Sequence, residues 1–181
     1  VNVAIGAEPG TMPFFRIGGS NDAWATGLSS FLREHVQAHI DRGYVAERAN
    51  EAGVELPDGD LIQEVAVTTL TFEQFLEQHG VGAYDVLIID TEGYDYEVLK
   101  LVDFTRHRPD LVWFESDNLS DTDYAAALSL LASHGYELRW SFLDTLGIRV
   151  PYPRRAALQA LALDFPARLQ HKVRRMVGRH A

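Results

Sequence analysis

The chain lacks several features that would assign it to a class of protein at once. It has no cysteine, which excludes a disulfide framework and thiolate chemistry. No apolar run approaches the roughly 20 residues of a membrane-spanning helix, and no signal-peptide pattern is present. The hydrolase motif Gly-x-Ser-x-Gly, the phosphate loop Gly-x-x-x-x-Gly-Lys and the zinc-protease motif His-Glu-x-x-His are also missing. These absences leave a cytoplasmic location as the expectation.

Basic residues are scarce in most of the chain. There are 16 Lys and Arg against 26 Asp and Glu, a net charge of -10. Seven of the basic residues and one acid, Asp164, lie from Arg154 onward, so the first 150 residues hold 9 basic and 25 acidic side chains. An acidic body of this kind argues against nucleic acid as a partner. The 181 residues, 46% of them hydrophobic, suit one domain or a large part of one.

The order of local patterns predicts an α/β fold. Strands are expected over 1–5, 12–17, 62–68, 86–90, 111–115, 136–142 and 145–150, and helices over 29–40, 72–79, 94–101 and 121–133. The first two strands are expected to form a hairpin, and residues 41–60 a loop with some helix. Thr71 and Gln74 match a helix-capping box. Alternation of strands and helices predicts a doubly wound, mostly parallel sheet, closed by an antiparallel pair of C-terminal strands around a turn at Asp144.

Acidic residues follow two of the predicted strands. Four apolar residues, 86–89, indicate a strand buried on both faces, and Asp90, Glu92 and Gly93 follow directly. Glu115 and Asp117 follow the next strand. Ligands bind beyond the carboxyl ends of strands in open α/β sheets, so these acids have the position of a site. The alternative is that Asp90 and Glu92 only cap the next helix, where acids are favoured.

Four segments together resemble the FkbM-type S-adenosylmethionine-dependent methyltransferases. Residues 86–99, VLIIDTEGYDYEVL, look like the family's strand, acid-x-acid-Gly turn and helix. The other three similar segments are 1–6, 65–76 and 109–115. Thr71 stands where the family usually has Asp, and Ile88 where it often has Lys. The resemblance covers roughly residues 1–150.

This resemblance implies a Rossmann-like domain, S-adenosylmethionine as cofactor, and O-methylation of a hydroxyl on a small molecule or sugar. It implies catalytic roles for Asp90 and Glu92, and cofactor contacts by Asp90 and Gly93. Acceptor-binding roles fall on Glu115, Asp117 and Tyr94. The family's N-terminal Asp-x-Gly-Ala-Asn-like turn has no counterpart here, so residues 1–150 are interpreted as the C-terminal part of the domain, inactive alone.

Two other functions remain open from the residues. Asp90, Glu92 and Glu115 could together hold a divalent cation, as in a metal-dependent α/β enzyme acting on phosphate groups. A degenerate methyltransferase fold could instead serve as a non-catalytic binding or assembly module. His35 and His39 have the spacing of paired metal ligands on a helix, but they are interpreted as ordinary histidines, and no residue is assigned to a metal.

Residues 151–181 are predicted to form a basic amphipathic helical tail. Six apolar residues recur there at three- or four-residue steps, with Arg and Lys between them: Leu158, Leu161, Phe165, Leu169, Val173 and Met176. Such a helix is expected to dock on the acidic body of the chain. A partner protein or an anionic membrane surface is the alternative.

Overall fold

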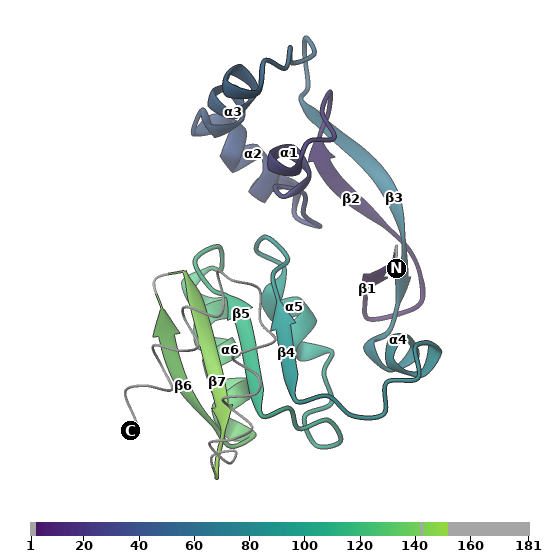
Figure 1. The fold of residues 1–181 in the computed structure, drawn as a ribbon, viewed down its shortest axis with the longest axis vertical. Coiled ribbons are helices and arrows are strands. Elements are labelled where there is room, and N and C mark those ends of the chain that lie inside the picture. The colour runs from purple at the N-terminus through teal and green to yellow at the C-terminus, as the bar shows by residue number, and fades with distance from the viewer. Residues whose placement is uncertain (1–2, 142, 152–181) are drawn as a thin grey trace.

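A computed structural model describes residues 3–141 and 143–151 of the chain (Figure 1). Two separate β-sheets make up its framework, and helices cover parts of both. The predicted tail, residues 151–181, lies outside the described residues except for Pro151. In the part of the chain that is described, no helix is long and apolar enough to cross a membrane.

The first sheet contains three strands: β1 (Ala4–Ile5), β2 (Gly10–Ile17) and β3 (Ile62–Leu70). Their order is β1-β3-β2, with β1 parallel and β2 antiparallel to β3. The predicted hairpin between the first two strands is therefore wrong. The connection between them crosses the end of β3, where the Gly6 amide donates to the Leu70 carbonyl and the Thr69 hydroxyl donates to the Glu8 carbonyl.

Three helices fill the long connection between β2 and β3: α1 (Ala23–Thr26), α2 (Arg33–Asp41) and α3 (Tyr44–Ala52). They pack on β2 and β3 around buried Ile17, Ala25, Leu28, Val36, Val45 and Ile62. The helix predicted over 29–40 begins later, because Ser30 pairs with Phe15 through two backbone hydrogen bonds. Gly43 and Gly53, both with positive φ, bracket α3.

The second sheet has the order β4-β5-β7-β6 (Figure 1). Its strands are β4 (Val86–Ile89), β5 (Leu111–Glu115), β6 (Tyr136–Ser141) and β7 (Asp144–Arg149). The antiparallel pair β6 and β7 agrees with the prediction, although Asp144 is the first residue of β7 instead of a turn residue. A mostly parallel arrangement is not found among the described strands. Among these strands, only the β1–β3 and β4–β5 pairs are parallel. In the first sheet β2 is antiparallel to β3, and in the second sheet β7 lies antiparallel between β5 and β6.

Helices α4 (Phe72–Gln78), α5 (Asp95–Lys100) and α6 (Asp121–Ser133) accompany the second sheet. Leu99 from α5 and Leu131 from α6 join Val112 and Phe114 of β5 in one buried core. The capping box of α4 is present. The backbone N–H of Gln74 donates to the Thr71 hydroxyl, and the Gln74 side-chain oxygen accepts from the backbone N–H of Thr71. Leu111–Phe114 of β5 are all buried, but Ile88 of β4 is 45% exposed. The prediction that residues 86–89 form a strand buried on both faces is therefore wrong.

Candidate functional site

The carboxyl ends of β4 and β5 lie at the same edge of the second sheet because the two strands are parallel. Asp90 and Glu92 follow β4, and Glu115 is the last residue of β5. One carboxylate oxygen from each of the three residues lies within 4.8 Å of the others. The structure therefore brings together three of the acids that the sequence singled out. The negative charges of Glu92 and Asp90 contribute to a raised pKa at Glu115.

The turn between β4 and α5 has an unusual backbone. Glu92 has a φ of 52°, the only positive φ among the described residues other than glycine, and Gly93 follows with 89°. A left-handed conformation costs a residue with a Cβ roughly 1–2 kcal/mol. Contacts from distant segments hold it: the Ser30 hydroxyl donates to the Glu92 carbonyl at 2.8 Å, and His35 Nε2 lies 3.1 Å from Glu92 Oε2. The connection between β2 and β3 therefore contacts both the backbone and the side chain of Glu92.

Gly93 has a steric role in this turn. A Cβ at this position would lie 3.3 Å from His35 Nδ1 and 3.4 Å from the Asn118 carbonyl oxygen, in a conformation that side chains rarely adopt. The glycine thus lets the His35 ring and the loop after β5 approach the turn closely. Its predicted cofactor contact remains a prediction.

The carboxyl of Glu115 has a strongly raised pKa. Burial raises its pKa to about 7, and the charges of Glu92, Asp90 and Asp95 add to the rise, whereas a hydrogen bond from Asn118 opposes it. That bond runs from Asn118 Nδ2 to Glu115 Oε2 at 2.8 Å, and the same nitrogen lies 3.4 Å from Glu92 Oε2. A carboxyl that titrates near neutral pH can exchange a proton with a substrate under ordinary conditions.

We expect carbon-detected NMR titration of the Glu115 carboxyl to give a pKa of about 7. Glu92→Gln should lower this pKa because it removes a neighbouring negative charge, and Asn118→Ala should raise it because it removes the donor. The pKa of Glu115 in the folded chain lies above the ordinary glutamate value of 4.5. The contribution of Glu115 to stability is therefore fully present below about pH 4.5 and is lost as the pH rises through 7. A higher Glu115 pKa in Glu92→Gln, or a lower one in Asn118→Ala, would contradict this account.

Asp95 was not assigned a role from the sequence, although an acid in the first turn of a helix is a recognisable signal. Its side chain is fully buried, and burial raises its pKa to about 6. Asp95 Oδ2 accepts hydrogen bonds from the Thr91 hydroxyl at 3.0 Å and from the Thr91 amide at 3.4 Å. Asp95 therefore fixes the residue between Asp90 and Glu92.

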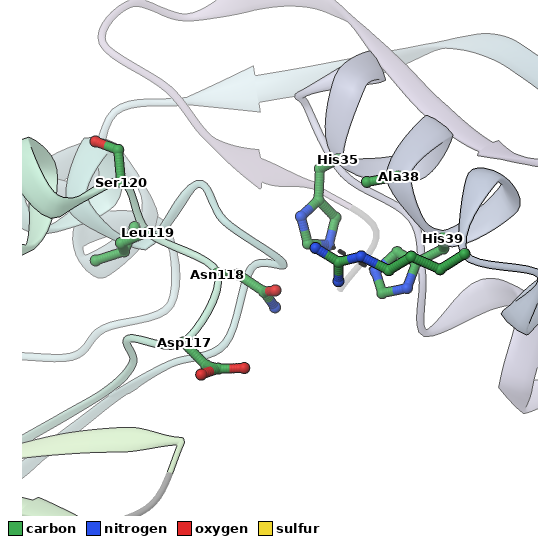
Figure 2. Close-up of a pocket in the computed structure, with 8 residues that line it drawn as sticks. His35, Ala38, His39, Asp117, Asn118, Leu119 and Ser120 are labelled. Carbon is green, nitrogen blue, oxygen red and sulfur yellow. Dashed lines mark hydrogen bonds between the residues drawn. The ribbon is translucent and has the colours of Figure 1, made fainter.

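The two remaining predicted site residues are placed differently. Tyr94 is half-buried, and its ring centroid lies 5.0 Å from that of Phe31; burial raises its pKa. Asp117 is exposed in the loop after β5, where its amide donates to the Leu143 carbonyl. Tyr94 thus contacts the connection between β2 and β3 through Phe31, and Asp117 lies beside Asn118 (Figure 2).

A pocket of about 370 Å³ lies between α2 and the loop after β5 (Figure 2). Its lining residues are His35, Ala38, His39, Arg42, Asp117, Asn118, Leu119 and Ser120. Burial lowers the pKa of His39, and neighbouring His35 lowers it further. Sequence reasoning did not assign His35 and His39 to a site; their four-residue spacing was the available signal, but the partner that faces them comes from a distant segment.

The family to which this chain belongs emerges from comparison with known proteins. A family model described as the methyltransferase FkbM domain matches residues 1–138. No curated protein and no solved structure matches the chain. The match includes β4, the Asp90–Gly93 turn, β5 and the Glu115–Ser120 loop, which carry the geometry above. Because it spans most of the sequence, the chain belongs to the FkbM methyltransferase domain family.

Proposed function

We propose that this domain takes part in S-adenosylmethionine-dependent methyl transfer to a hydroxyl group of a small molecule or sugar. The observation that carries the proposal is the group of three carboxylates, Asp90, Glu92 and Glu115, at the carboxyl ends of two parallel strands. This is the edge at which α/β sheets bind ligands. Membership of a methyltransferase family supplies the reaction class.

Transfer to a hydroxyl requires that the acceptor be aligned and that its proton leave. Positioning accounts for much of the barrier reduction in such displacements, and a base within hydrogen-bond reach adds to it. Asp90 is exposed at the end of β4, where an acceptor can reach its carboxylate. Glu92 already contacts His35 and Asn118, so its contribution is to hold the turn as well as to add charge. Glu115, with a pKa of about 7, is suited to receive a proton.

The residues present fit one end of the proposed cofactor. S-adenosylmethionine would supply a methyl group activated by its positively charged sulfur. The cluster of Asp90, Glu92 and Glu115 is anionic and matches that positive charge, with Asp90 and Gly93 as the proposed contacts. Glu115, Asp117 and Tyr94 are the proposed acceptor-binding residues. Within the described residues, no glycine-rich turn directly follows a buried parallel strand, so nucleoside contacts are not assigned.

Calorimetric titration with S-adenosylmethionine tests this function. We expect the domain, produced with any residues that precede Val1 in its reading frame, to bind the cofactor and to transfer a labelled methyl group to a hydroxyl acceptor from a panel of sugars. Asp90→Ala should weaken binding because it removes one of the proposed cofactor contacts. If a folded domain shows no heat of binding and no transfer, the proposal fails and a non-catalytic module becomes the better description.

A further inference from the structure

We propose that His35, His39 and Glu92 bind one divalent transition-metal ion. The ligands would be Nε2 of each histidine and a carboxylate oxygen of Glu92, and the ion would be of the zinc, iron or cobalt type. The site shares Glu92 with the carboxylate cluster, but the inference does not rest on the proposed methyl transfer, since metal binding can be measured without any acceptor or cofactor.

Helix α2 provides the first two ligands. His35 and His39 are four residues apart, so they project from the same face one turn from each other. Their Nε2 atoms lie 3.0 Å apart, and the two rings turn toward one another (Figure 2). His35 Nε2 is also 3.1 Å from Glu92 Oε2, and the three donor atoms all lie within 4.8 Å of one another. The donors therefore converge on one point.

The spacings agree with metal coordination. Two ligands at right angles, each about 2.1 Å from an ion, lie about 3.0 Å apart, and a tetrahedral pair lies about 3.4 Å apart. The observed 3.0 Å and 3.1 Å separations match the right-angled arrangement. Two imidazoles and one carboxylate on one side of an ion, with open positions opposite, form an arrangement typical of transition metals. Imidazole ligands argue against magnesium and calcium, which prefer oxygen.

Hydrogen bonding alone explains the cluster poorly. A neutral imidazole carries one N–H, yet His35 Nε2 faces both a second ring nitrogen and a carboxylate oxygen. If His39 donates to His35, no hydrogen is left between His35 and Glu92. If His35 carries the hydrogen, that single hydrogen is divided between two acceptors. A cation at the point of convergence satisfies all three lone pairs at once.

The third ligand is held in place by surrounding residues. Glu92 has its φ of 52° fixed by the Ser30 hydroxyl, and Asn118 Nδ2 lies 3.4 Å from the Glu92 carboxylate oxygen. Residues that hydrogen-bond to a ligating carboxylate orient it for the metal. Strained backbone of this kind persists where the surrounding structure over-determines it, and it is frequent at binding sites.

The site is also accessible. His35 and His39 form part of the wall of the 370 Å³ pocket, together with polar Arg42, Asp117 and Asn118. An ion held by the three ligands would therefore keep positions open toward this pocket. Water, or an oxygen-bearing small ligand whose negative charge suits Arg42, could occupy them.

Metal titration of the 181-residue chain tests the inference. After dialysis against a chelator, the protein would be titrated with Co²⁺, monitored by its visible absorption, and with Zn²⁺ in competition. We expect one ion per chain. His35→Gln and His39→Gln should each weaken binding by at least roughly 100-fold, because each removes a direct ligand. Glu92→Gln should weaken it in the same direction.

Matched histidine variants provide the control. His79→Gln and His134→Gln alter histidines at the ends of α4 and α6, away from the cluster, and should bind Co²⁺ as the unaltered chain does. Circular dichroism would verify that each variant is folded. The inference is overturned if the folded chain shows no saturable binding. It is also overturned if the His35→Gln/His39→Gln double variant binds with unchanged affinity, or if binding depends instead on His171 and His180.

Discussion

Replacing Asp90 with alanine should lower the turnover of methyl transfer by roughly 10²–10⁴-fold, the contribution typical of a well-placed base. The residue is exposed at the carboxyl end of β4, and its carboxylate lies within 4.8 Å of those of Glu92 and Glu115. Substitution of an exposed polar side chain changes the free energy of unfolding little, usually within about 0.5 kcal/mol. The measurements are kcat at saturating cofactor and the free energy of unfolding in urea.

Asp85 offers a matched control because it is an exposed aspartate at the opposite end of the same strand. Its backbone carbonyl accepts a hydrogen bond from the Leu111 amide, and Asp85→Ala leaves this bond in place. We expect Asp85→Ala to retain normal turnover. An Asp90→Ala enzyme that remains fully active would remove Asp90 from the catalytic group, whatever Asp85→Ala does.

Replacing Phe114 with alanine should lower the free energy of unfolding by about 3–5 kcal/mol, the cost typical of removing a buried aromatic ring. Phe114 is 0% exposed and lies in β5, which has strands on both sides. Its side chain belongs to the core shared with Leu99 and Leu131, so the lost ring would leave a cavity between the sheet and two helices. Urea denaturation monitored by circular dichroism measures the change.

Ile88→Ala is the control for this stability effect. Ile88 lies on the neighbouring strand β4, but its side chain is 45% exposed, so its removal creates no closed cavity. We expect its cost to fall well below that of Phe114→Ala, because it removes less apolar surface from burial. Equal losses in the two variants would mean that the core is not centred on β5.

Local signals allowed several elements to be predicted with their bounds. β5 and α6 begin and end at the predicted residues, since a run of apolar residues after Pro109 and a capped, alanine-rich stretch leave few alternatives. Strand pairing was less predictable. The position of β3 between β1 and β2 depends on contacts between residues about sixty positions apart, such as the Thr69 hydroxyl with the Glu8 carbonyl. No local pattern records such pairings.

The same distinction holds for the site. Asp90, Glu92 and Glu115 could be singled out because each follows a predicted strand, and parallel strand ends meet at one edge. The approach of His35 to Glu92 joins residues 57 positions apart and depends on how the connection between β2 and β3 folds back. The left-handed backbone at Glu92 was equally inaccessible, because glutamate has no special preference for it.

The connection between β2 and β3 has a consequence for how this family can diversify. Its two ends are joined by the Ile17 and Ile62 pair and by the hydrogen bond from the Gly18 amide to the Leu61 carbonyl. Residues 18–61 therefore leave and rejoin the sheet at one place, yet they supply Ser30, His35 and His39 to the edge near Asp90. We expect family members to tolerate replacement of this whole segment. Its replacement would change the ligand preference of the edge near Asp90 while the pairing of β2 with β3 is unchanged.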